Sequence, residues 1–235
     1  MSAAPGRPKQ VRTAAHQGEG TPVSDRHLIE EKLDGVELFK GHFLHAFRDT
    51  VRLPDGHSAV REYVRHPGAV MIIPLMEDAQ GGIRLVLERQ FRYPVGQVMI
   101  EFPAGKLDPG EDGLTCARRE LLEETGYSAT HWAKAGVLHP VIAYSTEFIE
   151  IWFARGLSQG PRRLDSGEFL DVLTASLDEL LGWCADGTVT DAKTLFHGSL
   201  SAQLGVMAGK ASGNGFVGLA AGLLAFLYLE QDRCR

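Results

Sequence analysis

Four glutamates and one arginine in the middle of the chain stand at spacings that can build one acidic site. The segment reads Gly105, five residues, Glu111, seven residues, Arg119-Glu120-Leu121, one residue, Glu123-Glu124, one residue, Gly126-Tyr127. Residues four apart share a helix face, so Glu120 and Glu124, with Glu123 beside them, crowd one surface. Carboxylate oxygens suit Mg²⁺ or Mn²⁺, whose remaining positions are filled by substrate phosphates and water. The pattern indicates metal-assisted hydrolysis of a diphosphate, in which the ion neutralises phosphate charge and lowers the pKa of the attacking water.

The alternative is that this acidic face is only solvated surface, as on most glutamate-rich helices. The fixed spacing argues against it, because average residue frequencies give a chance match somewhere in the chain on the order of 10⁻⁷. Arg119 is expected to pair with a neighbouring carboxylate and to hold the loop and helix in shape. For Glu111, structural support and direct metal ligation both stay open.

Local signals predict the helix that carries these carboxylates. Pro109-Gly110 favours a turn, Asp112 can cap the helix, and Gly126 supplies its end. An apolar stripe at helical spacing, for packing on a sheet, is formed by Leu114, Ala117 and Leu121.

Composition limits the other classes of function. With 235 residues and 44% hydrophobic content, the chain can bury one substantial core. A net charge of −6 and a pI near 5.8 argue against nucleic acid as a partner, which would require a basic surface. Cys116, Cys184 and Cys234 show neither disulfide nor metal-site spacing, which favours a reducing, cytoplasmic compartment.

Four regions are expected along the chain. Residues 1–22 have no continuous apolar core for a secretory signal and are expected to be disordered. A small N-terminal sheet over 23–65, a catalytic domain over 66–200 and a divergent, partly helical tail over 201–235 follow. In the tail, Phe216 to Leu229 is apolar but shorter than the roughly 20 residues that span a bilayer, so we predict a packed helix and no membrane partner.

Strand signals precede and follow the acidic helix. In the N-terminal region they cover Val36 to Phe47, Thr50 to Leu53 and Ser58 to Val64, with a turn at Pro54-Asp55-Gly56. Further strands are expected at Ala69 to Leu75, Ile83 to Phe91, Val98 to Phe102, Val137, Phe148 to Ala154 and Phe169 to Ala175, with an amphipathic helix at Leu177 to Ala185. The first of these strands is fully apolar and is expected to be buried on both faces. Strands interleaved with helices predict an α/β fold.

The flanks of the acidic segment extend the pattern. Glu88-Arg89-Gln90-Phe91-Arg92-Tyr93-Pro94 and Glu101-Phe102-Pro103-Ala104-Gly105-Lys106 lead into it. With the segment itself, which fits the Nudix box, they resemble the Nudix ADP-ribose pyrophosphatases and related nucleotide-sugar hydrolases over roughly Val36 to Leu195. The resemblance implies an α/β/α sandwich preceded by a small antiparallel β-sheet that helps to form a homodimer.

The same resemblance implies roles for individual residues. It gives the main-chain carbonyl of Ala104 with Glu120 and Glu124 as metal ligands, Glu123 joining them. Arg92 matches an arginine that grips substrate phosphate, against a surface salt bridge as the alternative. Glu147 lies where relatives position the terminal ribose, and Glu168 matches a mobile-loop glutamate that activates water; for each, an ordinary loop carboxylate is the alternative.

One departure bears on the substrate. ADP-ribose hydrolases carry a proline about sixteen residues after the last glycine of the box, where this chain has Ile142, with Pro140 two residues earlier. The first hypothesis is a Mg²⁺-dependent (or Mn²⁺-dependent) hydrolase that converts ADP-ribose to AMP and ribose 5-phosphate. The alternatives are a hydrolase of another nucleoside diphosphate sugar such as GDP-mannose, and a catalytically silent nucleotide-sugar sensor. The intact acidic cluster argues against a sensor.

Overall fold

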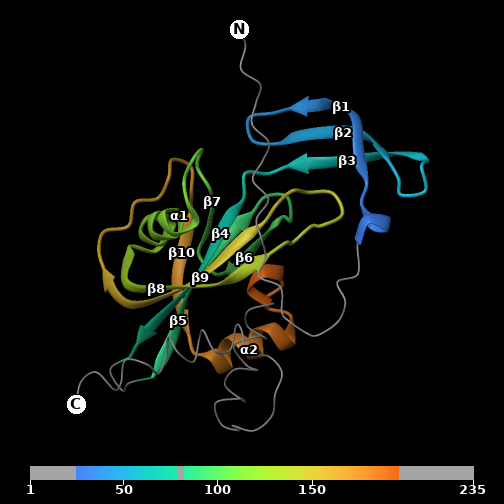
Figure 1. The fold of residues 1–235 in the computed structure, drawn as a ribbon. Helices are drawn as coiled ribbons and strands as arrows, with labels where there is room; N and C mark the ends of the chain where they lie inside the picture. The colour runs from blue at the N-terminus through green and yellow to red at the C-terminus, as the bar shows by residue number, and fades with distance from the viewer. Residues whose placement is uncertain (1–24, 79–81, 196–235) are drawn as a thin grey trace. The chain divides into compact units, whose positions relative to one another are not determined.

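The computed structural model describes residues 25–78 and 82–195 (Figure 1). The expectations for 1–22 and for the 201–235 tail with its apolar segment lie outside these residues. The chain divides into two compact units, one of Met1–Gly35 with Asp49–Arg61 and the other of Val36–Arg48 with Glu62–Arg235. Within the described ranges, no helix has the length and apolar character needed to cross a membrane.

Three strands form the N-terminal sheet. After a short 3₁₀ turn, η1 (Asp25–Leu28), the sheet has the order β1-β2-β3 and comprises β1 (Glu31–Lys40), β2 (His45–Arg52) and β3 (Ser58–Arg65). The expected turn at residues 54–56 is present: the Leu53 N–H donates to the His57 carbonyl over 2.7 Å, and Gly56 has a φ of 90°. The expectation of one segment from Val36 to Phe47 is wrong, because a turn separates β1 from β2. Gly41 makes this turn by donating to the Leu44 carbonyl at 2.8 Å.

The second sheet is mixed and has seven strands. Its strands are β4 (Ala69–Glu77), β5 (Ile83–Arg92), β6 (Gln97–Glu101), β7 (Ala104–Lys106), β8 (Tyr127–Leu138), β9 (Ile149–Gln159) and β10 (Leu170–Ala175). The main order is β10-β5-β4-β9-β8, with β6 paired to β5 and β7 paired to β4. The β4–β9 pair is parallel and the other pairs are antiparallel.

The central strand β4 is buried on both faces, as its apolar sequence predicts. On one face Met71 and Ile73 pack in a cluster with Leu180 of α2 (Leu177–Asp186). On the other, Val70 and Ile72 pack with residues of α1 (Gly113–Glu120). The two helices therefore cover opposite faces of the sheet, which confirms the α/β/α sandwich (Figure 1).

The predicted start and end of the helix that carries the Nudix box are present, but its last turn differs from a regular α-helix. The Asp112 carboxylate accepts from the N–H groups of Leu114 and Thr115 at 3.0 and 3.1 Å, and Gly126 ends the segment with a φ of 76°. Between them, η2 (Leu121–Thr125) is a π-helical turn and not regular α-helix. Such wide turns frequently occur at functional sites.

The sequence prediction missed β7 entirely and most of β8. β7 has three residues, too few to show a period. In β8 only Val137 was expected to be extended, although the strand starts at Tyr127. A bulge between Lys134 and Gly136 shifts its register and breaks the alternation on which strand prediction depends.

Candidate active site

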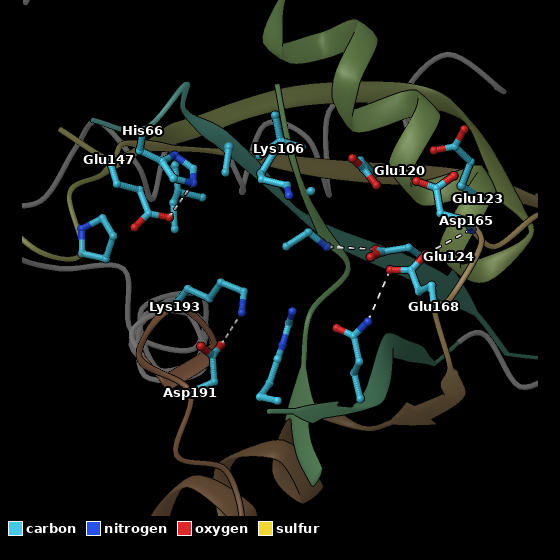
Figure 2. A pocket seen from close by; sticks show the side chains of 18 of the residues that line it. His66, Lys106, Glu120, Glu123, Glu124, Glu147, Asp165, Glu168, Asp191 and Lys193 are labelled. Carbon is cyan, nitrogen blue, oxygen red and sulfur yellow. Dashed lines mark hydrogen bonds and ion pairs between the residues drawn. The ribbon is translucent and has the colours of Figure 1, made fainter. Parts of the chain in front are cut away.

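A pocket of about 550 Å³ opens in the second unit, beside the acidic helix (Figure 2). Every residue that the sequence suggested for the site lines it: Arg92, Ala104, Glu120, Glu123, Glu124, Glu147 and Glu168. The structure thus brings together side chains from five separate stretches of chain. Their roles in ligation or catalysis remain predictions.

Arg119 organises the acidic segment from one side. Its guanidinium donates to Glu111 at 3.0 and 2.8 Å, to Glu120 at 2.8 Å and to Glu123 at 3.1 Å. It also donates to the Lys106 carbonyl at 3.2 Å, which ties the helix to β7. Arg119 therefore holds the loop and helix in shape, as its position in the sequence suggested.

Glu111 has a structural place in this network. Both of its oxygens accept from Arg119, and one also accepts from the Asp108 N–H at 3.0 Å. The hydrogen bonds from Arg119 lower the pKa of Glu111 to about 2. Since its oxygens are already occupied, the structure favours support of the loop over metal ligation.

Two glutamate carboxylates converge on the backbone at Ala104 and Gly105. Glu124 is 3% exposed and accepts from the Ala104 N–H at 3.0 Å. Burial, followed by the charges of Glu88 and Glu120, raises the pKa of Glu124 to about 10. A Cβ on Gly105 would lie 1.8 Å from the carboxylate of Glu120, so only glycine lets that carboxylate approach the chain here.

This arrangement fits a divalent cation with few side-chain ligands. In residues 25–78 and 82–195, no three His, Cys, Asp or Glu side chains are grouped closely enough to hold a metal by themselves. Glu120 and Glu124 instead lie at the same stretch of backbone, where the Ala104 carbonyl can complete a set of oxygen donors. Glu123 faces Arg119. A bound cation would offset the buried negative charge and polarise a diphosphate.

Arg92 makes a close contact that bears on its expected role. Its Nε and Nη2 donate to the two oxygens of Glu101, at 2.7 and 2.9 Å. Lys193 also donates to Glu101 and forms an ion pair with Asp191 at 3.1 Å. Burial acts to raise the pKa of Glu101, but hydrogen bonds from Arg92 and Lys193 outweigh it and the pKa is lowered.

Glu168 and Glu147 line different parts of the pocket (Figure 2). Glu168 follows a turn at Gly167 and accepts from the Gln90 side chain at 3.3 Å and from the Asp165 N–H at 3.4 Å. Glu147 lies 3.8 Å from Nε2 of His66. Figure 2 shows Glu168 with the box carboxylates and Glu147 on the opposite side with His66.

Sequence reasoning missed Glu88, which is fully buried on β5. Neither of its carboxylate oxygens has a hydrogen-bond partner among the described residues. Burial, and then the charge of Glu101, raises its pKa to about 8. A signal was present, because Glu88 directly follows the apolar run Leu85 to Leu87 inside a strand. His66, Lys106 and Lys193 also line the pocket and were not anticipated.

Comparison with known proteins agrees with this geometry. The NUDIX domain matches residues 65–197. The chain is 32% identical over 173 residues to the ADP-ribose pyrophosphatase of Bacillus subtilis (strain 168), covering 73% of this chain and 91% of that protein. It is 37% identical over 173 residues to the methanol dehydrogenase activator of Bacillus methanolicus, covering 72% and 90%.

A solved structure shows the same fold. The crystal structure of an ADP compounds hydrolase superposes with a TM-score of 0.67 at 22% identity, covering 77% of this chain and 96% of that one. At this identity the likeness concerns the fold, while the matched NUDIX domain and the ADP-ribose pyrophosphatase relative establish the family. The chain belongs to the Nudix family and is a Nudix hydrolase.

Proposed function

We propose that this protein hydrolyses the diphosphate bond of ADP-ribose, giving AMP and ribose 5-phosphate, with Mg²⁺ or Mn²⁺. The observation that carries the proposal is the convergence of Glu120 and Glu124 on the Ala104-Gly105 backbone inside the pocket. The relative from Bacillus subtilis named ADP-ribose pyrophosphatase, which this chain matches over most of its length, supports the choice of substrate.

We propose a separate role for each group of residues in the pocket. Glu120, Glu124 and the Ala104 carbonyl hold the cation, with Glu123 at the edge of the set. Arg92 meets a substrate phosphate, and Glu147 contacts the terminal ribose. Glu168 takes the proton of the attacking water, because carboxylates bound to a cation are poor proton acceptors. Its contacts with Gln90 and Asp165 support this by keeping it inside the pocket.

The experiment is a panel of diphosphates with purified protein and Mg²⁺, with products separated by chromatography. ADP-ribose should have the highest kcat/KM and yield AMP and ribose 5-phosphate in equal amounts. A higher kcat/KM for GDP-mannose or another nucleoside diphosphate sugar would show that this compound is the substrate, while the proposed reaction type would still hold. Tight binding of ADP-ribose without cleavage would favour the sensor.

We further propose that the N-terminal sheet builds a homodimer. Support comes from β1, which is exposed along its whole length and carries four large apolar side chains at 45–56% exposure: Leu33, Val36, Leu38 and Phe39. A dimer mass in solution across micromolar concentrations is expected, and a monomer mass would contradict this part of the proposal. We also place the protein in the cytoplasm, in keeping with the free thiols of Cys116 and Cys184.

A further inference from the structure

The pocket carries a surplus of negative charge that an anionic substrate must overcome. Seven of its lining residues are acidic, and three are lysine or arginine: Arg92, Lys106 and Lys193. A diphosphate entering beside these carboxylates needs cations that are not already neutralised. Arg92 keeps donors beyond its ion pair with Glu101, so the question is which further cation can bind the substrate.

Two of the three are engaged at one buried carboxylate. Arg92 and Lys193 both donate to Glu101, whose side chain is 3% exposed, and Lys193 also pairs with Asp191. Drawing either cation away would leave Glu101 buried with fewer partners, which costs free energy. Lys106, in contrast, forms no ion pair with any carboxylate of the residues that the structure describes.

Lys106 is held in place by its backbone and by an aromatic ring. It pairs with Ala69 of β4 and its carbonyl accepts from Arg119 at 3.2 Å, so its backbone is fixed at both sides. Its Nζ lies 4.3 Å from the centre of the Phe43 ring. Phe43, in the turn between β1 and β2, in turn packs edge-on against His66 with ring centres 5.4 Å apart. The ring therefore restricts an otherwise flexible ammonium group.

His66 cannot neutralise the ammonium group of Lys106, because an imidazole carries no negative charge. Its Nδ1 accepts from the Gly68 N–H at 3.1 Å, which leaves the proton of the neutral ring on Nε2, toward Glu147. Burial is the main cause that lowers the pKa of His66. The charge of Glu147 raises this pKa, and the charge of Lys106 lowers it. In Figure 2, Lys106 lies between the box carboxylates on one side and His66 with Glu147 on the other.

We infer that Lys106, oriented by the Phe43 ring, binds the diphosphate oxygens of the substrate, in addition to the phosphate contact proposed for Arg92. The inference rests on the proposed function, because it takes the cation site and the terminal-sugar site to lie at the two ends of the pocket. The diphosphate links the two moieties and must pass Lys106. Phe43 is then a positioning residue and does not itself touch the reacting atoms.

The test measures binding of α,β-methylene ADP-ribose, which cannot be cleaved between its phosphorus atoms, by calorimetry with Mg²⁺ at low and high KCl. Charge-assisted phosphate contacts predict that Lys106→Met raises Kd about 10-fold to 100-fold, while Lys106→Arg stays within about 3-fold. The dependence of Kd on KCl should also weaken in Lys106→Met. Lys134→Met is the matched control, since Lys134 also lies over a ring, that of Trp152, and does not line the pocket.

A double-mutant cycle tests whether Phe43 affects substrate binding through Lys106. Phe43→Leu should raise Kd about 2-fold to 5-fold, the size of an exposed cation–π contact, and Phe43→Tyr should restore binding. Added to Lys106→Met, Phe43→Leu should cause no further loss, because its effect acts through the ammonium group. Equal losses in the presence and absence of Lys106 would overturn the positioning role. Lys106 is exposed, and thermal melts of each variant establish that the fold is retained.

A second probe separates failure of this inference from failure of the proposed function. The α,β-methylene analogue of GDP-mannose shares the diphosphate and changes the base and sugar. If the wild type binds either analogue and Lys106→Met binds it equally well, the role of Lys106 is wrong and the proposed function is not affected. If the wild type binds the GDP-mannose analogue more tightly and Lys106→Met no longer binds it, ADP-ribose is not the preferred substrate but the proposed role of Lys106 is confirmed. Binding of neither would overturn both.

Discussion

Arg92, which lines the pocket, forms a two-point ion pair with Glu101, with N–O distances of 2.7 and 2.9 Å. Glu101 is buried, so the pair fixes the guanidinium plane while leaving Arg92 39% exposed toward the pocket. The two readings of Arg92, a phosphate contact and a salt bridge, are thus not exclusive. A guanidinium has five donors, and only two of its nitrogens serve Glu101.

Replacement of Arg92 should therefore affect both binding and stability. Arg92→Ala should lower kcat/KM at least about tenfold, through loss of a charge-assisted contact. From sequence alone its thermal stability would be expected to stay nearly unchanged, but the buried Glu101 predicts a loss of about 1–3 kcal/mol in unfolding free energy. Urea titration and steady-state kinetics measure the two effects. Arg48→Ala, which breaks an exposed pair with Glu62, should change neither by much.

Glu88 should make the fold less stable as pH rises. Its pKa is raised to about 8 in the folded protein, so above the usual carboxyl pKa the unfolded chain releases a proton that the folded chain keeps. Stability is full below about pH 4.5 and is lost progressively up to about pH 8. Near pH 9, Glu88→Gln should melt at a higher temperature than the wild type. At about 1.4 kcal/mol per pKa unit, its free energy of unfolding should be higher by a few kcal/mol.

The two proteins should converge near pH 5, and both are measured in EDTA so that a bound cation does not enter the comparison. Exposed Glu31→Gln is the control and should show no such trend. A constant difference between Glu88→Gln and the wild type at all pH values would contradict a protonated, buried Glu88.

Gly105→Ala should separate folding from cation binding. The new methyl group would lie 1.8 Å from the Glu120 carboxylate, the flexible end of that side chain, so Glu120 can move away and the fold should survive. Displacement of Glu120 should weaken Mn²⁺ binding, measured by electron paramagnetic resonance, by about tenfold or more. Gly182→Ala, where a Cβ meets nothing within 4 Å, should leave Mn²⁺ binding unaltered.

Glu168 and Glu147 should give opposite kinetic patterns. Glu168→Gln should lower kcat by about 10² or more with a modest change in KM, since a general base contributes about 10²–10⁴-fold. Glu147→Gln should mainly raise KM, because Glu147 lies with His66 away from the box carboxylates. The reverse pattern would exchange the two roles. If neither variant lowers kcat, no separate base is needed.

The sequence predicted the parts of this molecule that depend on local pattern. The cap at Asp112, the end of the helix at Gly126 and the two-sided burial of β4 follow from residue type and period alone. Arg92, Ala104, Glu120, Glu123 and Glu124 were reached through the spacing of the box and its flanks, and Glu147 and Glu168 through the family resemblance. All of them line one pocket.

Features that depend on contacts between distant segments could not be read in this way. The pairing of Arg92 with Glu101 and Lys193 joins two strands and the C-terminal part of the fold, and the Phe43–Lys106 contact joins the first hairpin to β7. The bulge in β8 hides its period, and the π-helical turn at Leu121–Thr125 depends on more than helix propensity. The apolar run before Glu88 hinted at its burial, but that its carboxylate lacks a hydrogen-bond partner among the described residues required the fold.

The most direct test of the account compares ADP-ribose hydrolysis by the wild type and Glu120→Gln over a titration of Mg²⁺, with circular dichroism as the check on folding. We expect no turnover in EDTA, turnover restored by Mg²⁺ in the wild type, and a loss of about 10³-fold or more in folded Glu120→Gln at saturating Mg²⁺. Turnover near the wild-type level in Glu120→Gln, or cleavage that persists in EDTA, would contradict it.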